Sequence, residues 1–320
     1  MNIIVIGGSA GAIKSLKAMI AMLPSDIDAA VFVVIHIPPD KPSNLPNILS
    51  TPEGWKAKHA VDSESISVQN IYVARPGCHL LIEEGKTLLG KGPTENRFRP
   101  SIDVLFRSAA LAYGSQVTGI LLSGVLDDGT AGLSAVKKMN GTVIIQHPDD
   151  AEFTGMPLNA LQKVGADHCV PAMAMGPLLS KLPTINLKQK VMKNDAFEWE
   201  NNIALGPNSS FSDLNKFASP TRYICPDCEG PLFRMKDEKL VRYRCFVGHA
   251  VSEETLLNEI SEKLDHLLWT TYRTLDEKRE MIDNLAIPSE GLKAEKLRIT
   301  QQMESFKDLL GLASPETISK

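Results

Sequence analysis

The feature that most constrains the fold is a regular alternation, in the first half of the chain, of apolar runs with helix-compatible segments. The apolar runs are rich in Val and Ile and lie at Asn2–Ile6, Ala30–Ile35, Ile71–Ala74, Val117–Leu122 and Thr142–Gln146. The helix-compatible segments are Ile13–Met22, Ile102–Tyr113 and Ala131–Met139. Because the apolar runs are continuous, they predict strands buried on both faces of a mainly parallel sheet. The fold class expected is therefore α/β, doubly wound.

The rest of the chain changes character near Pro183. We expect a catalytic domain over residues 1–182, a polar linker over 183–220, a small cysteine-bearing module over 221–251, and C-terminal helices over 252–320. Ser252 is a helix N-cap candidate, and the apolar spacing after it predicts a helix that ends before Pro288. A second amphipathic stretch, Leu292–Leu310, predicts a helical hairpin.

Charge and hydropathy exclude several classes of protein. The chain has 34 Lys plus Arg against 38 Asp plus Glu, a formal charge of −4, so it lacks the basic excess typical of nucleic-acid binders. No apolar run approaches the ~18 residues of a membrane helix. The run after Met1 and Asn2 has neither a basic leader nor a cleavage site. We therefore expect a cytoplasmic protein that does not insert directly into a membrane.

Three predicted strands end in residues that together suggest a serine hydrolase. Ser9 lies in a glycine-flanked turn after the first strand, His36 ends the second, and an Asp127-Asp128-Gly129 turn follows Val117–Leu122. The carboxyl ends of parallel strands meet at one edge of a sheet. A serine hydroxyl needs a base to remove its proton, and the base needs a third group to orient it.

Each of these signals also has a simpler explanation. The turn at Gly7–Gly11 is equally typical of a phosphate-binding or purely structural glycine turn, and Asp-Asp-Gly is an ordinary turn signal. A dinucleotide-binding fold would favour an acid where His36 stands. The residues alone do not decide between Asp127 and Asp128.

A set of segments spread over residues 1–182 resembles the catalytic domain of the CheB family, the chemotaxis-receptor protein-glutamate methylesterases. The matching segments are Ile6-Gly7-Gly8-Ser9, His36-Ile37-Pro38-Pro39, Tyr72-Val73-Ala74 with Pro76 to His79, Arg99 to Phe106, Asp128-Gly129 and Gly155-Met156-Pro157. The resemblance implies that Ser9 is the nucleophile, His36 the general base and Asp128 the aspartate that orients it. It also implies hydrolysis of a γ-glutamyl methyl ester on a chemoreceptor or related signalling protein, deamidation of glutamine as a second activity, and no catalytic cofactor.

The sequence departs from the family pattern at Ala12, which stands where a glycine is common, and in the loop before Asp128. Val125 stands where the family usually has methionine and Leu126 where it has glycine, so a positive φ at Leu126 would be strained by order 1 kcal/mol. Because the segment that resembles the catalytic domain begins at Met1, we expect no receiver domain before it. We therefore expect activity to be constitutive, or controlled by a partner or by the C-terminal extension.

The C-terminal extension contains a metal-ligand pattern. Cys225 and Cys228 form a CxxC pair, and Cys245 and His249 form a CxxxH pair. Three thiolates and one imidazole fill a tetrahedral shell, so the pattern predicts a structural zinc site in a zinc-ribbon-like module. A redox CxxC pair or a chance cluster is the alternative. Stand-alone relatives of the CheB family carry a similar pattern.

Two functional alternatives to the hydrolase are kept. One is a catalytically weak or inactive methylesterase fold that acts as a signalling or docking module, favoured by Val125 and Leu126. The other, a nucleotide-binding α/β protein, rests only on the glycines at Gly7–Gly11. As partners we expect a methylated receptor or signalling protein, no nucleic acid, and self-association through the long C-terminal helices.

Overall fold

The computed structural model describes residues 1–38, 41–50, 54–182, 192–206, 214–236 and 239–310. The chain groups into two compact units, Met1–Thr255 and the segment from Leu256 onward. The first unit contains both the α/β part and the cysteine-bearing segment, and the second contains most of the C-terminal helical region.

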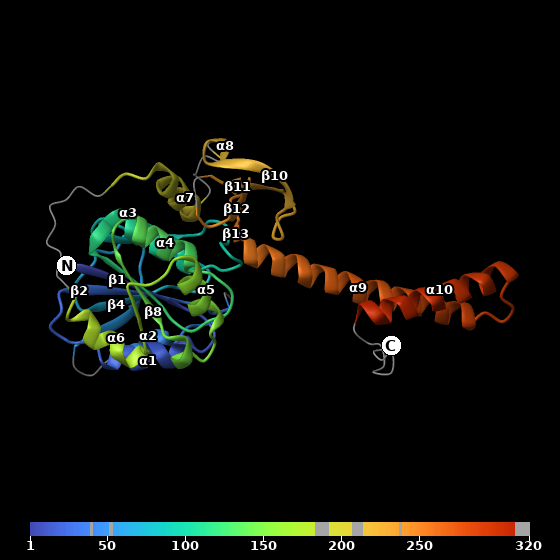
Figure 1. Cartoon of the computed structure of the whole chain (residues 1–320), viewed down its shortest axis with the longest axis horizontal. Helices are drawn as coiled ribbons and strands as arrows, with labels where there is room; N and C mark the ends of the chain where they lie inside the picture. The colour runs from blue at the N-terminus through green and yellow to red at the C-terminus, as the bar shows by residue number, and fades with distance from the viewer. Residues whose placement is uncertain (39–40, 51–53, 183–191, 207–213, 237–238, 311–320) are drawn as a thin grey trace. The chain divides into compact units, whose positions relative to one another are not determined.

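A seven-stranded parallel sheet forms the centre of the first unit (Figure 1). Its strands are β1 (Asn2–Gly8), β2 (Ala29–Ile35), β3 (Lys56–His59), β4 (Asn70–Val73), β7 (Val117–Leu121), β8 (Thr142–Gln146) and β9 (His168–Val170). Their spatial order is β3-β4-β2-β1-β7-β8-β9. From β1 the chain forms β2, then the edge strand β3, and then β4 between β3 and β2; from β7 it builds outward on the other side of β1. The loops after β1, β2 and β7 therefore meet where the winding reverses, which is where open α/β sheets bind ligands.

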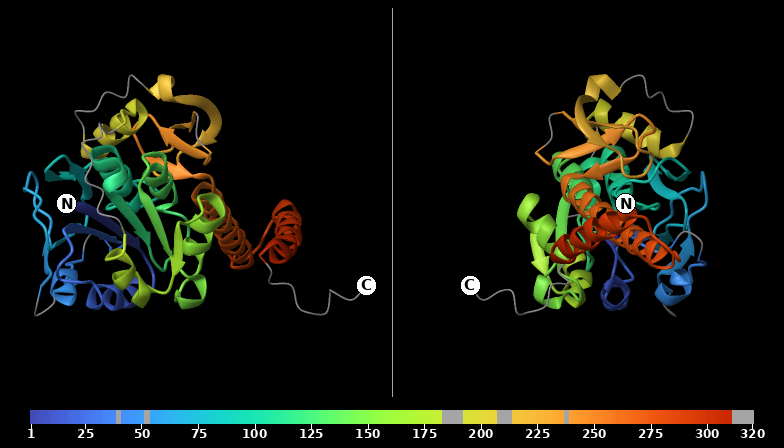
Figure 2. Two further views of the ribbon diagram at one scale, coloured as in Figure 1. Left: turned by 60° about the vertical axis from the view of Figure 1, so that its left-hand side comes forward. Right: turned by 90° about the vertical axis from the view of Figure 1, so that its right-hand side faces the viewer.

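Helices cover both faces of the sheet, as the views in Figures 1 and 2 show. One face carries α1 (Ala12–Ala21), α2 (Leu45–Leu49) and α6 (Ala172–Leu179), and the other carries α3 (Ile102–Tyr113), α4 (Thr130–Lys138) and α5 (Gly155–Lys163). Successive side chains of a strand point to opposite faces. Ile4 and Ile6 accordingly join one hydrophobic cluster and Ile3 and Val5 the other. The doubly wound α/β fold predicted from the apolar runs is confirmed.

The structure adds elements that the apolar pattern did not predict. β3 and β9 are the two edge strands, and a hairpin of β5 (His79–Glu83) and β6 (Lys86–Gly90) lies outside the sheet. β3 alternates exposed and half-buried residues because an edge strand needs no continuous apolar run. Two short 3-10 segments, Gly114–Gln116 and Pro148–Asp150, complete the connections.

The segment predicted as a linker contains helix α7 (Asp195–Leu205). Asn194 caps it by accepting a hydrogen bond from the Phe197 backbone N–H at 3.1 Å. Phe197 packs into the α/β core, whereas Trp199 and Ile203 pack with the strands that follow. Residues 195–205 of the predicted linker are therefore packed against the rest of the first unit. Phe211, another aromatic residue of this segment, lies outside the described residues.

Four antiparallel strands follow the short helix α8 (Leu214–Phe217), and we call these strands and the turns between them the β-module. They are β10 (Ala218–Ile224), β11 (Pro231–Met235), β12 (Arg242–Cys245) and β13 (Ala250–Ser252), paired in that order. The segment expected to form a zinc-ribbon-like module thus belongs to a four-stranded sheet.

Two long helices complete the chain, α9 (Glu253–Asp283) and α10 (Glu290–Leu309). Ile282 of α9 packs against Ile299 and Met303 of α10, which confirms the predicted hairpin. No helix among the described residues has a stretch both long and apolar enough to cross a membrane.

Candidate active site

Ser9 lies in the turn between β1 and α1. Its backbone N–H donates to the carbonyl of Ser123 at 2.9 Å, and Gly11 opens the helix with φ +72°. A Cβ at position 11 would lie 2.7 Å from Glu152 Cβ, so the close approach as well as the positive φ requires glycine. This turn holds the Ser9 side chain at the carboxyl edge of the sheet.

His36 and Asp128 form a hydrogen-bonded pair. His36 Nε2 lies 2.8 Å from Asp128 Oδ2, and both side chains are buried. The imidazole also stacks on the Phe98 ring, with centroids 3.4 Å apart and planes 9° apart. His36 Nδ1 is buried without a hydrogen-bond partner among the described residues. The histidine is thus held on one nitrogen and unengaged on the other.

Asp128 accepts several further hydrogen bonds. The Ile102 N–H donates to it at 2.7 Å, the Ser101 hydroxyl at 2.9 Å and the Asn96 carboxamide at 3.1 Å. Burial favours the neutral acid, but the hydrogen bond and charge of His36, with the Ile102 and Asn96 donors, hold the pKa of Asp128 below its usual value. The carboxylate is therefore fixed in orientation and kept ionised.

Ser9 and His36 line one open cavity of about 670 Å³. Ala10, Gly11, Lys14, Lys17 and Glu152 are among its other lining residues. No hydrogen bond joins the Ser9 hydroxyl to His36 within the described residues. The structure thus pairs His36 with Asp128 and brings Ser9 to the same cavity.

Asp127 faces away from this pair. Its carboxylate accepts from the Ser252 hydroxyl at 2.7 Å and the Thr255 hydroxyl at 3.1 Å, and Lys163 Nζ lies 3.3 Å away. Of the two neighbouring aspartates that the sequence left open, only Asp128 contacts His36.

The loop that departs from the family pattern adopts the strained conformation. Leu126 has φ +62°, a left-handed conformation that a glycine would take without cost. Val125 is 44% exposed. A Cβ on Gly124 would lie 2.8 Å from Met156 Sδ and 3.0 Å from Ser9 Cβ, so Gly124 packs directly behind the serine. The substitutions therefore leave the contact between Gly124 and Ser9 intact, and the strain lies two residues further along the chain, at Leu126.

The four predicted metal ligands of the β-module come together. The ligand atoms of Cys225, Cys228, Cys245 and His249 all lie within 4.8 Å of one another. Cys228 Sγ is 3.6 Å from Cys245 Sγ, and His249 Nδ1 is 3.6 Å from Cys245 Sγ and 3.8 Å from Cys225 Sγ. Two thiolates on a tetrahedral zinc, with Zn–S bonds near 2.3 Å, are separated by about 3.8 Å. The donor set and its spacing fit zinc.

A buried ion cluster joins the β-module to the α/β part. Glu95 pairs with Arg107 at 3.0 Å and Arg244 at 2.9 Å, and Glu200 pairs with Arg242 at 3.1 Å and Arg244 at 2.7 Å. Burial alone would raise the pKa of Glu95, but the charges of Arg107 and Arg244 hold it at about 2. The pKa of Glu200 is lowered in the same way.

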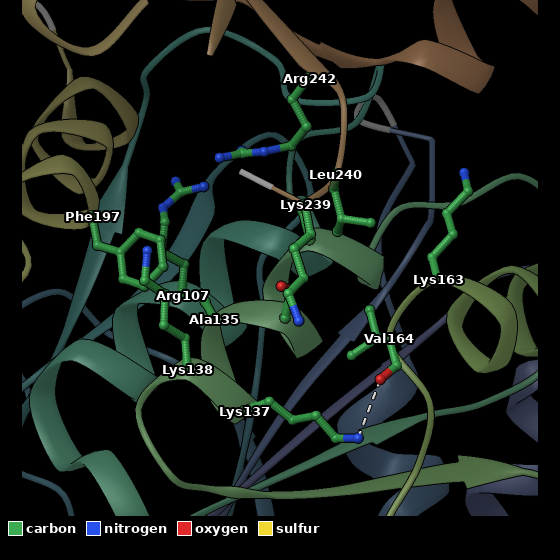
Figure 3. A pocket seen from close by; sticks show the side chains of 12 residues that line it. Arg107, Ala135, Lys137, Lys138, Lys163, Val164, Phe197, Lys239, Leu240 and Arg242 are labelled. Atoms are coloured by element: carbon green, nitrogen blue, oxygen red, sulfur yellow. Dashed lines mark hydrogen bonds between the residues drawn. The ribbon is translucent and has the colours of Figure 1, made fainter. Parts of the chain in front are cut away.

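A second cavity, of about 430 Å³, lies beside this cluster and is lined largely by basic side chains (Figure 3). The guanidinium groups of Arg107 and Arg242 lie near one another at one end of it. Lys137 Nζ donates to the carbonyl of Val164 at 3.2 Å, and Lys138 lies over the Phe197 ring. The arginines are already paired with buried glutamates. Residues of α3, α4 and α7, the end of α5, and the segment that leads into β12 line this cavity.

Sequence reasoning missed three residues that contact the His36–Asp128 pair, namely Asn96, Phe98 and Ser101. Ser101 could have been identified from the sequence, because it is a polar residue directly before a predicted helix. Asn96 and Phe98 lie in an irregular turn with no periodic pattern. Only their tertiary contacts identify them.

Comparison with known proteins gives one family. The model of the CheB methylesterase family matches residues 4–179. A protein from Leptospira interrogans, provisionally named as a protein-glutamate methylesterase/protein-glutamine glutaminase, is 35% identical over 188 residues, covering 58% of this chain and 97% of its own length. A protein-glutamate methylesterase/protein-glutamine glutaminase of Methanosarcina acetivorans is 34% identical over 178 residues, covering 53% of this chain and 50% of that protein.

A solved structure agrees with these sequence matches. The crystal structure of the Thermotoga maritima CheB methylesterase catalytic domain aligns with a TM-score of 0.54 and 32% identity. The alignment covers 57% of this chain and 98% of that domain. The similarity therefore lies in the α/β part, and it leaves out most of the chain beyond residue 182.

Proposed function

Because the chain belongs to the CheB methylesterase family, we propose that it is a protein-glutamate methylesterase with Ser9 as nucleophile, His36 as general base and Asp128 as the group that orients the base. The observation that carries this proposal is the 2.8 Å hydrogen bond from His36 to Asp128, beside a cavity that Ser9 also lines. The three residues come from three loops of one sheet edge, as a nucleophile–base–acid relay requires.

The hydrogen bond to Asp128 determines which nitrogen of His36 carries the proton. An ionised carboxylate only accepts hydrogen bonds, so the His36 nitrogen that faces Asp128, Nε2, carries the proton. Nδ1 then has a free lone pair, and it has no other partner among the described residues. We infer that Nδ1 is the atom that takes the Ser9 proton, after a small closure of the two side chains when substrate binds.

The reaction then proceeds through an acyl-enzyme. Ser9 Oγ attacks the ester carbonyl as its proton moves to His36 Nδ1, and this proton is then given to the departing methoxide, which leaves as methanol. Water, activated by the same nitrogen, releases the glutamate carboxylate and restores Ser9. The Ala10 N–H at the entrance to α1 is the first donor we propose for the oxyanion.

The substrate we propose is a γ-glutamyl methyl ester on a chemoreceptor or related signalling protein. The cavity at Ser9 is open, so an ester on a protein helix can reach it as well as a small ester can. The relatives' names also include glutaminase, which supports deamidation of glutamine as a second activity through the same acyl-enzyme.

Two measurements test the nucleophile. A synthetic peptide carrying a γ-glutamyl methyl ester should release methanol, and a fluorophosphonate should label the protein at Ser9. Ser9→Ala should abolish both without changing the melting temperature. Ser123→Ala is the control, because the Ser123 hydroxyl at the same edge is already bonded to the carbonyl of Ala10 at 2.8 Å, and it should leave Ser9 labelling in place.

A folded wild-type protein that releases no methanol and takes no label would favour the second function considered, a docking module that retains the fold. The strained Leu126 and the absence of a Ser9–His36 hydrogen bond within the described residues are the observations that favour this alternative. Retained turnover in Ser9→Ala would instead remove Ser9 from the nucleophile's role.

We also propose that the four-residue cluster of the β-module binds a structural zinc ion. Four protein ligands close a tetrahedral shell and leave no position for substrate, so the ion would stabilise the fold rather than take part in the reaction. Purified protein should contain one zinc per chain by atomic emission. Cys228→Ser should lose it, whereas Cys169→Ser, outside the cluster, should keep it. Equal zinc content in the two variants would contradict the assignment.

The C-terminal helices are proposed to associate with a second copy of the chain. Leu257, Ile260, Leu264 and Leu267 of α9 are each at least 50% exposed and recur at spacings of three and four residues, the pattern of a helix–helix seam. Sedimentation equilibrium should report a dimer that Leu264→Glu dissociates. A wild-type monomer would contradict this proposal.

A further inference from the structure

The turn at residues 94–98 contacts both members of the His36–Asp128 pair. The Asn96 carboxamide donates to Asp128 at 3.1 Å and to Asp103 at 2.9 Å, and Phe98 stacks on the His36 ring. Asn96 is only 5% exposed. Its amide hydrogens are therefore committed to the two buried carboxyl groups, and the turn that carries it sets the position of the pair.

Strand β13 of the β-module holds this turn. The Asn96 N–H donates to the carbonyl of Ala250 at 2.8 Å, and the Ala250 N–H donates to the carbonyl of Thr94 at 3.2 Å. Asn96 Oδ1 accepts from the Ser252 N–H at 3.0 Å. Three hydrogen bonds thus fix both the backbone and the side chain of the turn to a strand that lies about 150 residues further along the chain.

The same strand starts at the proposed zinc site. Ala250 directly follows His249, and the His249 carbonyl accepts from the Cys245 N–H at 3.0 Å. Arg244, next to Cys245, donates to the carbonyl of Gly248 at 2.7 Å and to Glu95 at 2.9 Å. The side chains and backbone that shape the Cys/His cluster therefore also anchor the turn at Glu95, one residue before Asn96.

We propose that Asn96 is a positioning residue of the proposed methylesterase relay, and that the β-module, folded around its Cys/His cluster, holds Asn96 against Asp128. The proposal rests on the proposed function. It gives the C-terminal extension a role in the reaction, in which the module completes the support of the catalytic carboxylate and does not touch the substrate.

The hydrogen bonds to Asp128 explain the expected size of the effect. His36, Ser101 and Ile102 belong to the α/β part, and Asn96 is the donor whose position depends on the module. Loss of one outer hydrogen bond that orients a functional group typically reduces activity 10- to 100-fold. Asn96 does not line the Ser9 cavity, so KM should not change.

A second connection links the end of the β-module and the start of α9 to the relay, and the experiment has to distinguish it from the connection through Asn96. The Ser252 and Thr255 hydroxyls donate to Asp127, the residue before Asp128. If this connection rather than Asn96 transmitted the effect of the module, loss of the module would slow an enzyme that already lacks the Asn96 side chain.

The experiment combines two changes in the full chain, Asn96→Ala and Cys228→Ser, singly and together. Each variant is measured for kcat and KM on the γ-glutamyl methyl ester peptide, for the rate of fluorophosphonate labelling of Ser9, for zinc content and for melting temperature. Asn96→Ala should lower kcat and the labelling rate 10- to 100-fold, with KM unchanged and zinc retained. Cys228→Ser should lower both rates by a similar factor.

The double variant decides the route. Because both changes act on the same hydrogen bond, Cys228→Ser should slow the Asn96→Ala protein less than twofold further. Losses that multiply would overturn the connection through Asn96. A kcat for Asn96→Ala within twofold of wild type, with the wild type active, would overturn the positioning role while leaving the proposed function intact. An inactive, unlabelled wild type would refute the proposed function itself.

Two further variants separate a positioning role from a structural one. Asn96→Asp keeps the shape and the acceptor for the Ser252 N–H but loses both donors, so it should be at least as slow as Asn96→Ala. Full activity in Asn96→Asp would show that shape alone is required and would overturn the proposal. Asn96 has a positive φ, +50°, which alanine adopts less readily than asparagine. Asn140→Ala is the control for this backbone effect, because Asn140 has a φ of +62° but is exposed and does not contact the relay, and it should retain wild-type kcat.

Discussion

The Ser9 cavity and the β-module use similar polar residues in opposite ways. At the cavity, His36 Nδ1 has no partner among the described residues, and the Ser9 hydroxyl is not bonded to it. In and beside the β-module, Glu95 and Glu200 are each paired with two arginines at 3.1 Å or less, and the cysteines converge on one point. A free acceptor beside a cavity marks the reactive region, and compensated charge marks the supporting one, where Arg244 Nε alone of the arginine nitrogens in the cluster is buried without a partner among the described residues.

This difference has a physical cause. A buried polar group without a partner costs free energy, so it persists only where it has a use. A cluster of buried ion pairs instead makes the approach of two chain segments specific, because removing any member leaves a charge uncompensated. A nitrogen without a partner therefore points to a site only where, as at His36, it belongs to a side chain that lines a cavity together with a candidate nucleophile.

The largest expected effect tests the assignment of the two neighbouring aspartates. Asp128→Asn should reduce kcat by the order of 10⁴-fold, because an amide facing His36 Nε2 favours the wrong tautomer. Asp127→Asn is the matched control and should stay within about tenfold of wild type, since Asp127 contacts Ser252 and Thr255 instead. Steady-state kinetics measure both variants, and an equal loss of kcat in the two would contradict the assignment of different roles to Asp128 and Asp127.

The next effect tests the supporting role of the ion cluster. Glu200→Gln removes the charge that compensates Arg242 and Arg244 and should lower the free energy of unfolding by about 3–5 kcal/mol. Glu198→Gln, on the same helix but exposed, should change it by less than about 0.5 kcal/mol. Urea unfolding measures both. A small change in the free energy of unfolding for Glu200→Gln would mean that these buried ion pairs contribute little to stability.

The acid dependence of stability sharpens the same point. Glu95 has a pKa of about 2 in the folded protein, below the value of about 4.3 for an unfolded chain. Its contribution, about 3 kcal/mol, is therefore complete above the unfolded pKa and is lost as the pH falls from about 4.3 to 2. Urea unfolding should show this loss in wild type and a shallower one in Glu95→Gln. An identical dependence of the free energy of unfolding on pH in the two proteins would contradict the low pKa of Glu95 in the folded state.

The smallest effect concerns the strained loop behind Ser9. Leu126→Gly should relieve a positive-φ strain of about 1–2 kcal/mol and lose about 0.4–1 kcal/mol through a freer unfolded chain, a net stabilisation of about 0.5 kcal/mol. Val125→Gly, at the neighbouring position without a positive φ, should destabilise the protein by a similar amount. Thermal unfolding distinguishes the signs. A destabilised Leu126→Gly would mean that leucine packing outweighs the strain.

Much of the sheet was predictable because its central strands are continuously apolar. The predicted runs at Ala30–Ile35 and Thr142–Gln146 agree with β2 and β8 to within one residue. The edge strands β3 and β9 and the helix α7 were not predicted. β3 is polar along one side, and α7 divides its apolar residues among three hydrophobic clusters, so neither gives a clear single-face pattern.

The sequence predicted the proposed catalytic residues of the candidate site, but it did not predict all the residues that position them. Ser9 and His36 follow strand ends that the pattern located, and the resemblance singled out Asp128 where spacing alone left Asp127 as a rival. Asn96 could not be found, because its partners Asp128 and Ser252 lie far from it in the sequence. No local pattern encodes such a contact.

The sequence by itself determined the central strands and several helices between them, the serine and histidine at one sheet edge, and the spacing of the four candidate zinc ligands. These depend on periodicity and on short-range spacing, which a linear chain carries directly. Tertiary structure alone decided how Asp128 meets His36, which nitrogen of His36 remains free, and that β13 lies along the turn of Asn96. Such contacts follow from long-range packing and buried hydrogen bonding, where the free energy depends on the whole fold at once.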